Sequence, residues 1–192
     1  MIKKLIFSAE LVLYFLLLIN ISFADIQKDL VNKITATKTL TFDFSQQIAE
    51  KKEYGNCFIK YPLLMKCNYE NNKQKSVISN GRTLAVVKKK YKKIYYYPIK
   101  TTPFSIILKK EKILNLVRNS QPIEISSNEI IFRLIAKKLN TIDIYFDKKT
   151  LNLKGWKTKD NYSNNVDFVI SNLESNKIID DSFFKIPKEK DL

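Results

Sequence analysis

The stretch GNCFIKYPLLMKCNY, residues 55–69, has the pattern of two strands joined at a proline. Cys57 and Cys67 lie at matching distances on either side of Pro62, and apolar residues surround them. If Pro62 stands at the tip of a hairpin, the two cysteines face one another, and directly opposite residues are close enough for a disulfide. A redox pair, a metal site and a disulfide across two strands are the three interpretations open at this point.

A strand with the same alternation precedes this stretch. Leu40, Phe42 and Phe44 alternate with polar residues, which is typical of a strand with one buried and one solvated face. Asn80-Gly81 predicts a tight turn, because both residues tolerate positive φ. Short strands separated by such turns predict an antiparallel meander. We expect its strands at residues 40–45, 54–61, 64–69, 76–79, 83–87, 92–96, 123–126, 130–135, 141–146, 151–158 and 166–173.

Three segments favour helices instead. Apolar residues recur at helical spacing from Ile26 to Ile34. Residues 101–108 fit a helix in which a threonine caps the free amides and Pro103 occupies the first turn, and residues 111–117 fit a second short helix. The predicted fold class is α+β, with these helices beside a sheet of about ten or eleven strands, which curls at that size.

Aromatic and branched apolar residues are abundant on the predicted strands. Most of them would make a core in any fold, but one curved sheet with a few short helices cannot close-pack all of this apolar area. We therefore expect an apolar cavity on the concave side of the sheet. Its candidate lining residues are Leu40, Phe42, Phe44, Phe58, Leu64, Met65, Tyr69, Leu84, Tyr95, Phe132, Leu134, Ile144 and Phe146.

The N-terminus has the parts of a secretory signal peptide. A basic start is followed by an apolar run over residues 5–21 and by small residues at Ser22 and Ala24. A membrane anchor is the alternative interpretation, but the run is short and polar residues interrupt it. We expect residues 1–24 to be cleaved and residues 25–192 to form a single exported domain that is soluble.

The formal net charge of +15 comes mainly from lysine, which outnumbers arginine by 31 to 3. Such a charge is typical of proteins that bind nucleic acid or an anionic membrane surface. Export argues against nucleic acid. A coding bias toward lysine, asparagine and isoleucine and a basic surface that favours anionic lipid head groups both fit the composition.

Enzymatic chemistry has no support in the sequence. Histidine is absent, which removes the usual general base and the commonest metal ligand. The three glycines lie too far apart for a phosphate-binding loop, and the carboxylates show no paired spacing. We expect no catalytic residue, no cofactor and no metal site. In an oxidising exported compartment, a disulfide between Cys57 and Cys67 is then favoured over zinc, which needs four ligands.

Five short motifs follow one another along the chain. They are LTFDFSQQ at residues 40–47, GNCFIKYP at 55–62, NGRTL at 80–84, TPF at 102–104 and FKIP at 184–187. In this order and spacing they resemble the motifs of the periplasmic outer-membrane lipoprotein carrier family, the LolA-like proteins. The resemblance covers nearly the whole chain after residue 24.

The resemblance implies an incomplete, strongly curved antiparallel barrel whose apolar interior, closed by lid helices, takes the acyl chains of a lipoprotein. It implies a periplasmic carrier that receives acylated lipoproteins from an ABC-type release complex of the inner membrane. Delivery is to the outer membrane, in many bacteria to a receptor lipoprotein. We expect a monomer. The lid and its latch would comprise Tyr61, Pro62, Thr102, Pro103, Phe104 and Ile107.

One departure from the family pattern bears on the cargo. Tyr61 stands where the family typically has an arginine that holds the lid closed, and a tyrosine offers one hydrogen-bond donor in place of several. A carrier of free phospholipid or glycolipid is therefore a second hypothesis. A third is a non-catalytic module with a filled interior, which binds the anionic envelope through its basic surface in a salt-sensitive manner.

Overall fold

The computed structural model describes residues 25–70, 74–136, 139–160 and 162–192, so the predicted signal peptide lies outside the described residues. A helix over residues 25–36 comes first. The other helical elements are η1 (Lys89–Tyr91), η2 (Ile99–Thr101), α2 (Phe104–Ile107), α3 (Lys110–Asn119), η3 (Asp181–Phe184) and η4 (Glu189–Asp191). The strands are β1 (Thr39–Ile48), β2 (Lys51–Lys60), β3 (Leu64–Tyr69), β4 (Lys75–Asn80), β5 (Thr83–Lys88), β6 (Lys93–Pro98), β7 (Glu124–Ile125), β8 (Glu129–Ala136), β9 (Leu139–Asp147), β10 (Leu153–Lys159) and β11 (Asn165–Ser175).

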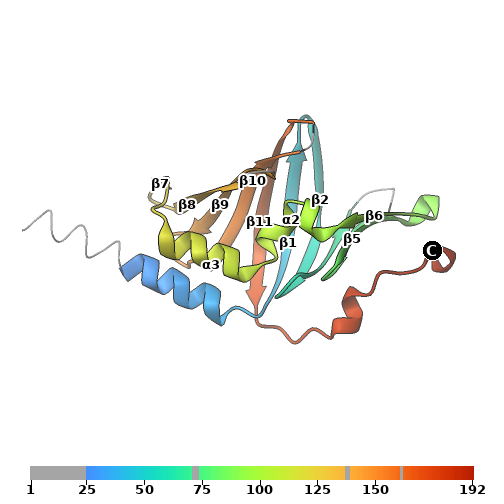
Figure 1. The fold of residues 1–192 in the computed structure, drawn as a ribbon, viewed down its shortest axis with the longest axis horizontal. Coiled ribbons are helices and arrows are strands. Elements are labelled where there is room, and N and C mark those ends of the chain that lie inside the picture. The colour runs from blue at the N-terminus through green and yellow to red at the C-terminus, as the bar shows by residue number, and fades with distance from the viewer. Residues whose placement is uncertain (1–24, 71–73, 137–138, 161) are drawn as a thin grey trace, which may run out of the picture.

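The strands form one 11-stranded antiparallel sheet in the order β6-β5-β4-β3-β2-β1-β11-β10-β9-β8-β7. Strands β1 and β11, the first and last in the chain, pair in the middle, and successive hairpins extend the sheet in both directions. Among the described residues, β6 and β7 remain its two edges, so the sheet curves around the helices without closing (Figure 1). The predicted open antiparallel barrel with few helices is confirmed.

The apolar residues whose alternation predicted the strands are the buried ones, and the polar residues between them are more exposed. In β1, Leu40, Phe42 and Phe44 are buried on the concave side, while Asp43 is exposed. The buried rows of the sheet pack against apolar residues of the N-terminal helix, α2 and α3 in one core cluster. Because burying a large apolar side chain stabilises a fold by about 1.5–3 kcal/mol, this concave core holds the helices on the sheet.

The start of α2 differs from the prediction. The side chain of Thr102 does not cap a free amide; its Oγ1 donates a hydrogen bond to the carbonyl of Ile99 at 2.9 Å. The amides of Ser105 and Ile106 donate instead to the carbonyls of Thr102 and Pro103. The turn of η2 leads directly into α2, so backbone carbonyls are in place where a side-chain cap was expected.

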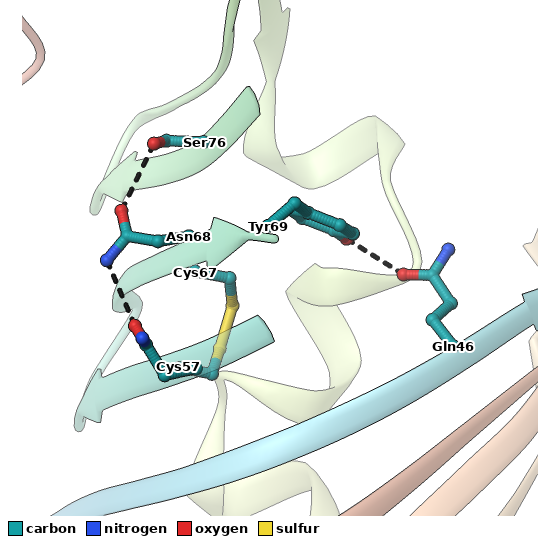
Figure 2. Close-up of a disulfide and its surroundings, with 7 residues drawn as sticks. Gln46, Cys57, Cys67, Asn68, Tyr69 and Ser76 are labelled. Atoms are coloured by element: carbon teal, nitrogen blue, oxygen red, sulfur yellow. Dashed lines mark hydrogen bonds between the residues drawn. A yellow bond between two sulfur atoms is a disulfide. The ribbon is translucent and has the colours of Figure 1, made fainter. Parts of the chain in front are cut away.

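Cys57 and Cys67 form the predicted disulfide. The β2–β3 register pairs them directly, and their Cα atoms lie 4.0 Å apart. Both side chains are buried in the concave core. Figure 2 shows the bridge across the two strands, with Tyr69 further along β3.

Residues 176–192 leave β11 and cross the convex face of the sheet toward β6; we call them the C-terminal arm (Figure 1). Phe183 packs edge-on against Phe58, with ring centroids 4.9 Å apart. Lys60 contacts Asp181 at 2.6 Å. The arm ends on a small second core formed by Ile78, Ala85, Val87 and Ile94, against which Ile186 and Leu192 pack.

Candidate functional site

A helical cover lies over the concave face. The segment that joins the edge strands β6 and β7 crosses this face as η2, α2 and α3, beside the N-terminal helix (Figure 1). The Lys110 ammonium donates hydrogen bonds to the carbonyls of Thr35 at 3.0 Å and Thr37 at 3.1 Å, which joins α3 to the end of the N-terminal helix. The helices therefore form one connected cover.

The tip of the β2–β3 hairpin holds this cover through the backbone. The amide of Leu63 donates to the carbonyl of Leu108, at the end of α2, at 3.0 Å. The carbonyl of Leu63 in turn accepts a hydrogen bond of 2.6 Å from Oγ of Ser79, whose side chain is fully buried. The hairpin tip thus contacts the end of α2 through its backbone. A latch role for Tyr61 and Pro62 stays a prediction.

Tyr61 packs inward between the helices and the sheet. With Ile34, Ile113 and Phe146 it lines a small, mainly apolar hollow of about 40 Å³. Burial raises the pKa of the Tyr61 hydroxyl well above its usual range, so the side chain stays neutral at physiological pH. Its place at the meeting point of the N-terminal helix and α3 makes it part of the contact between cover and wall.

Aromatic rings line the middle of the concave face. Trp156 stacks on Phe168 with ring centroids 4.0 Å apart, and Phe44 stacks on the same ring at 4.8 Å. Tyr69 meets Phe44 edge-on at 5.0 Å, and Phe42 meets Phe168 edge-on at 6.3 Å. These contacts join strands β3, β1, β11 and β10 into one aromatic wall.

A second hollow of about 220 Å³ lies between this wall and the lid; we call it the lid pocket. Phe104 and Ile107 of α2 line one side, and Trp156 and Phe168 line the other. Both hollows are smaller than the roughly 300–1,000 Å³ of sites for drug-sized ligands. Neither of these two hollows has room for several acyl chains, so the acyl-chain cavity stays a prediction.

A polar cluster occupies the concave side where β1 and β3 end and β2 and β4 begin. Glu53 accepts hydrogen bonds from Lys51 at 2.8 Å and Lys75 at 2.6 Å. The Tyr69 hydroxyl donates to Oε1 of Gln46 at 2.8 Å (Figure 2), and the Lys75 ammonium lies 3.5 Å from the centre of the Tyr69 ring. This cluster was not predicted from the sequence, although Glu53 lies on the same face of β2 as Gly55, two residues later.

The Glu53 carboxylate should contribute to stability only when it is ionised. Burial opposes the charge, but the hydrogen bonds from Lys51 and Lys75 outweigh it and lower the pKa of Glu53 below its ordinary value. A depressed carboxyl pKa adds stability above the unfolded pKa, and this stability is lost as the pH falls through the folded pKa. Glu53→Gln should lower the free energy of unfolding by about 2 kcal/mol at pH 7.

Urea unfolding at pH 7 and at pH 3 measures this effect. The difference between the native protein and Glu53→Gln should shrink at the lower pH, because below its unfolded pKa the carboxyl adds progressively less stability as the pH falls toward its lowered folded pKa. Glu50→Gln, at an exposed turn position, is the control and should change little at either pH. An equal loss at both pH values would show that packing, and not the charge, makes the difference.

Most predicted lining residues belong to the concave core: Leu40, Phe42, Phe44, Met65, Tyr69, Leu84, Phe132, Leu134, Ile144 and Phe146. Their contact with acyl chains stays a prediction. In the lid, Phe104 and Ile107 face this core, and Thr102 and Pro103 precede them. Phe168 was not among the predicted lining residues. It forms an apolar row with Val166 and Ile170 at two-residue spacing, and this row could have indicated it.

Two of the predicted lining residues, Phe58 and Leu64, face the convex side, which corrects their assignment. Phe58 points to the convex face, where Phe183 of the C-terminal arm packs on it. Leu64 pairs with Lys60 and shares the face of Phe58. Tyr95, on the edge strand β6, pairs with Val86 and is 46% exposed, and its place in an acyl-chain cavity stays a prediction. In β2 the inward row is formed by Gly55, Cys57 and Ile59, so Phe58 faces outward.

Among the described residues, no group of three or more cysteine, aspartate or glutamate side chains is arranged to hold a metal ion. No helix in the described ranges is long and apolar enough to cross a bilayer.

An open antiparallel half-barrel whose apolar concave face lies under helices defines the class of LolA-like binding folds. The chain belongs to the family described as "Outer membrane lipoprotein carrier protein LolA", whose model matches residues 35–187. The family resemblance seen in the motifs is thereby confirmed. No curated protein matches the chain in sequence.

Solved structures of low sequence identity are similar in outline. An uncharacterized conserved protein from Thermus thermophilus has a TM-score of 0.49 and 9% identity, covering 86% of this chain and 94% of that one. A LolA superfamily protein from Nitrosomonas europaea has a TM-score of 0.44 and 7% identity, covering 83% and 97%. A putative outer membrane lipoprotein-sorting protein domain from Vibrio parahaemolyticus has a TM-score of 0.46 and 7% identity, covering 81% and 94%.

Proposed function

We propose that this protein is a periplasmic carrier that takes lipoprotein acyl chains onto its concave face and transfers them from the inner to the outer membrane. Family membership over residues 35–187 supports the carrier role. The observation that carries the proposal is the aromatic wall around Phe168, which faces the helical cover. The tip of the β2–β3 hairpin holds this cover through the hydrogen bond from the Leu63 amide to the Leu108 carbonyl.

The energetics favour this use of the wall. Each methylene moved out of water is worth about 0.8 kcal/mol, so an acyl chain needs only partial cover to stay bound. The hollows of about 40 and 220 Å³ leave little room while the lid lies on the wall. Uptake of several chains therefore requires α2 and α3 to move away, which exchanges protein contacts for contacts with the cargo.

The proposed route sets the partners. Cargo leaves the inner membrane with the help of an ABC-type lipoprotein release complex, because extraction of acyl chains from a bilayer is uphill without a coupled reaction. Delivery needs an acceptor at least as apolar as the concave face, either the outer membrane itself or a receptor lipoprotein. No enzymatic step is required, so we propose a binding protein without catalytic activity.

A free phospholipid or glycolipid is the second candidate cargo, and one observation favours it. Tyr61, which stands in the sequence where the family typically has the latch arginine, lines the hollow of about 40 Å³. A latch without an arginine fork offers fewer donors to the lid backbone, so the lid and its cargo can differ from those of other members.

Mass spectrometry of material that co-purifies with the folded protein from its own periplasm separates these two candidates. Triacylated or diacylated lipoproteins would support the first, and phospholipid alone would support the second. A folded preparation that carries neither, and that also fails to bind an added acylated lipopeptide, would contradict both.

Phe104→Ala tests where the acyl chains bind. Phe104 is half-buried in the lid and lines the lid pocket, so its loss should weaken binding of an acylated lipopeptide about tenfold. The measurement is displacement of an environment-sensitive apolar fluorophore.

Phe58→Ala is the matched control, because Phe58 is also a half-buried phenylalanine but lies on the convex face. It should reduce stability without changing the affinity for the lipopeptide. Equal loss of affinity in the two variants would place the binding site away from the lid pocket.

A further inference from the structure

We propose that the lid pocket binds one ester- or amide-linked fatty acyl chain and that the hydroxyl of Thr158 donates a hydrogen bond to the carbonyl of that linkage. This inference rests on the proposed function and adds to it a single residue that selects the chemistry of the linkage. It concerns a buried hydroxyl oxygen beside the apolar rings of the wall.

The lining of the lid pocket suits an acyl chain. Its volume of about 220 Å³ lies between α2 and the sheet, with Phe104 and Ile107 on the lid side and Trp156 and Phe168 on the wall. Flat rings and branched side chains offer close contacts along an extended methylene chain.

Thr158 is one of the polar residues in this lining. Its Oγ1 is buried and has no hydrogen-bond partner among the described residues. Buried hydroxyl groups almost always have a partner, because an unpaired one loses its hydration without compensation. An unpaired hydroxyl in the wall of a pocket is explained if its partner belongs to a ligand.

The position of Thr158 matches the order of groups in an acyl lipid. Trp156 lies two residues before it on β10 and therefore on the same face, within the aromatic wall. The next residues, Lys159 and Asp160, complete the lining with charged groups. From the rings outward, the lining changes from apolar to hydroxyl to charged, as an acyl lipid changes from chain to carbonyl to head group.

Gln46 adds a second polar group to the same pocket. It is buried, and the Tyr69 hydroxyl donates to its Oε1, which fixes the orientation of the amide. Figure 2 shows the amide nitrogen on the side away from Tyr69. Such a fixed amide makes this part of the wall suited to polar atoms and unsuited to an uninterrupted hydrocarbon.

The test compares ester lipids with ether lipids of the same chain length, because an ether oxygen accepts hydrogen bonds more weakly than a carbonyl. Binding is measured to a diacylglyceryl lipopeptide and to a phospholipid, each in ester and dialkyl ether form. The wild-type protein should bind the ester form about fivefold more tightly than the ether form, which corresponds to one hydrogen bond. Whichever of the two ester lipids shows this preference identifies the source of the chain.

Thr158→Val keeps the shape of the side chain and removes the hydroxyl, so the ester preference should fall to about one. Thr158→Ser keeps the hydroxyl and should retain the preference, and it keeps the proposal testable if the valine variant does not fold. Thr41→Val, on the convex side of β1, is the matched control and should leave the preference unchanged.

The outcomes separate the two proposals. If the wild-type protein binds neither lipid, the proposed carrier function fails. If it binds both lipids and the ester preference is absent, or is the same in Thr158→Val, the carrier function stands and the role of Thr158 is overturned.

Discussion

Gly55→Ala should lower the free energy of unfolding by about 3 kcal/mol or more, since it forces a side chain into closely packed backbone. A Cβ atom at this position would lie 2.0 Å from the carbonyl oxygen of Asn68 and 2.9 Å from the ring of Phe44. The carbonyl belongs to β3, so strands β2 and β3 would have to separate beside their disulfide. Urea unfolding of the purified variant measures the loss.

Gly81→Ala is the control for this prediction. A Cβ at Gly81 would meet only Leu64, at 3.9 Å, so its cost comes from the positive φ of 93° and should be near 1 kcal/mol. If the two variants lose the same stability, backbone conformation and not the close strand contact accounts for the need for glycine at Gly55. Phe44 should also leave the aromatic wall in Gly55→Ala, which near-ultraviolet circular dichroism can detect.

Removal of the disulfide should produce the second large effect. The bridge closes a loop between residues separated by 10 positions, and constraint of the unfolded chain by such a loop is worth about 2–3 kcal/mol. The double variant Cys57→Ala/Cys67→Ala should lose this stability in denaturant unfolding. Because both side chains are buried in the core, lost packing adds to the effect.

Dithiothreitol separates the bridge from the packing. The reductant should destabilise the native protein and leave the double variant unchanged, because only the native protein has a bond to break. Loss of stability in both proteins, or in neither, would contradict the expected contribution of the bridge.

Most of the fold could be predicted from residue patterns. The alternation of Leu40, Phe42 and Phe44 with polar residues predicted β1, and the symmetry of Cys57 and Cys67 about Pro62 predicted the β2–β3 hairpin. These signals are local, because a strand's side chains alternate whatever its neighbours are. The pairing of β1 with β11 depends on contacts between the ends of the chain, and no local pattern indicates it.

The concave site was less accessible to sequence reasoning. Alternation shows that Cys57 and Phe58 face opposite sides, but both are apolar, and the choice of side depends on the C-terminal arm that covers Phe58. The bond from Leu63 to Leu108 joins backbone atoms and leaves no trace in residue type. The unpaired hydroxyl of Thr158 likewise becomes visible only when its surroundings are packed.

The C-terminal arm has a consequence for the mechanics of the sheet. It is attached at the end of β11, where the Asn176 amide donates to the carbonyl of Thr39, and again at the far edge, where the Ile94 amide donates to Glu189 at 3.0 Å. The arm thus supports strands β2 to β5 on their convex face, so these strands resist flattening. This half of the sheet is therefore the stiff part of the molecule, and the helical cover is the compliant part. The interior should gain volume by displacement of the helices, while the strands keep their curvature.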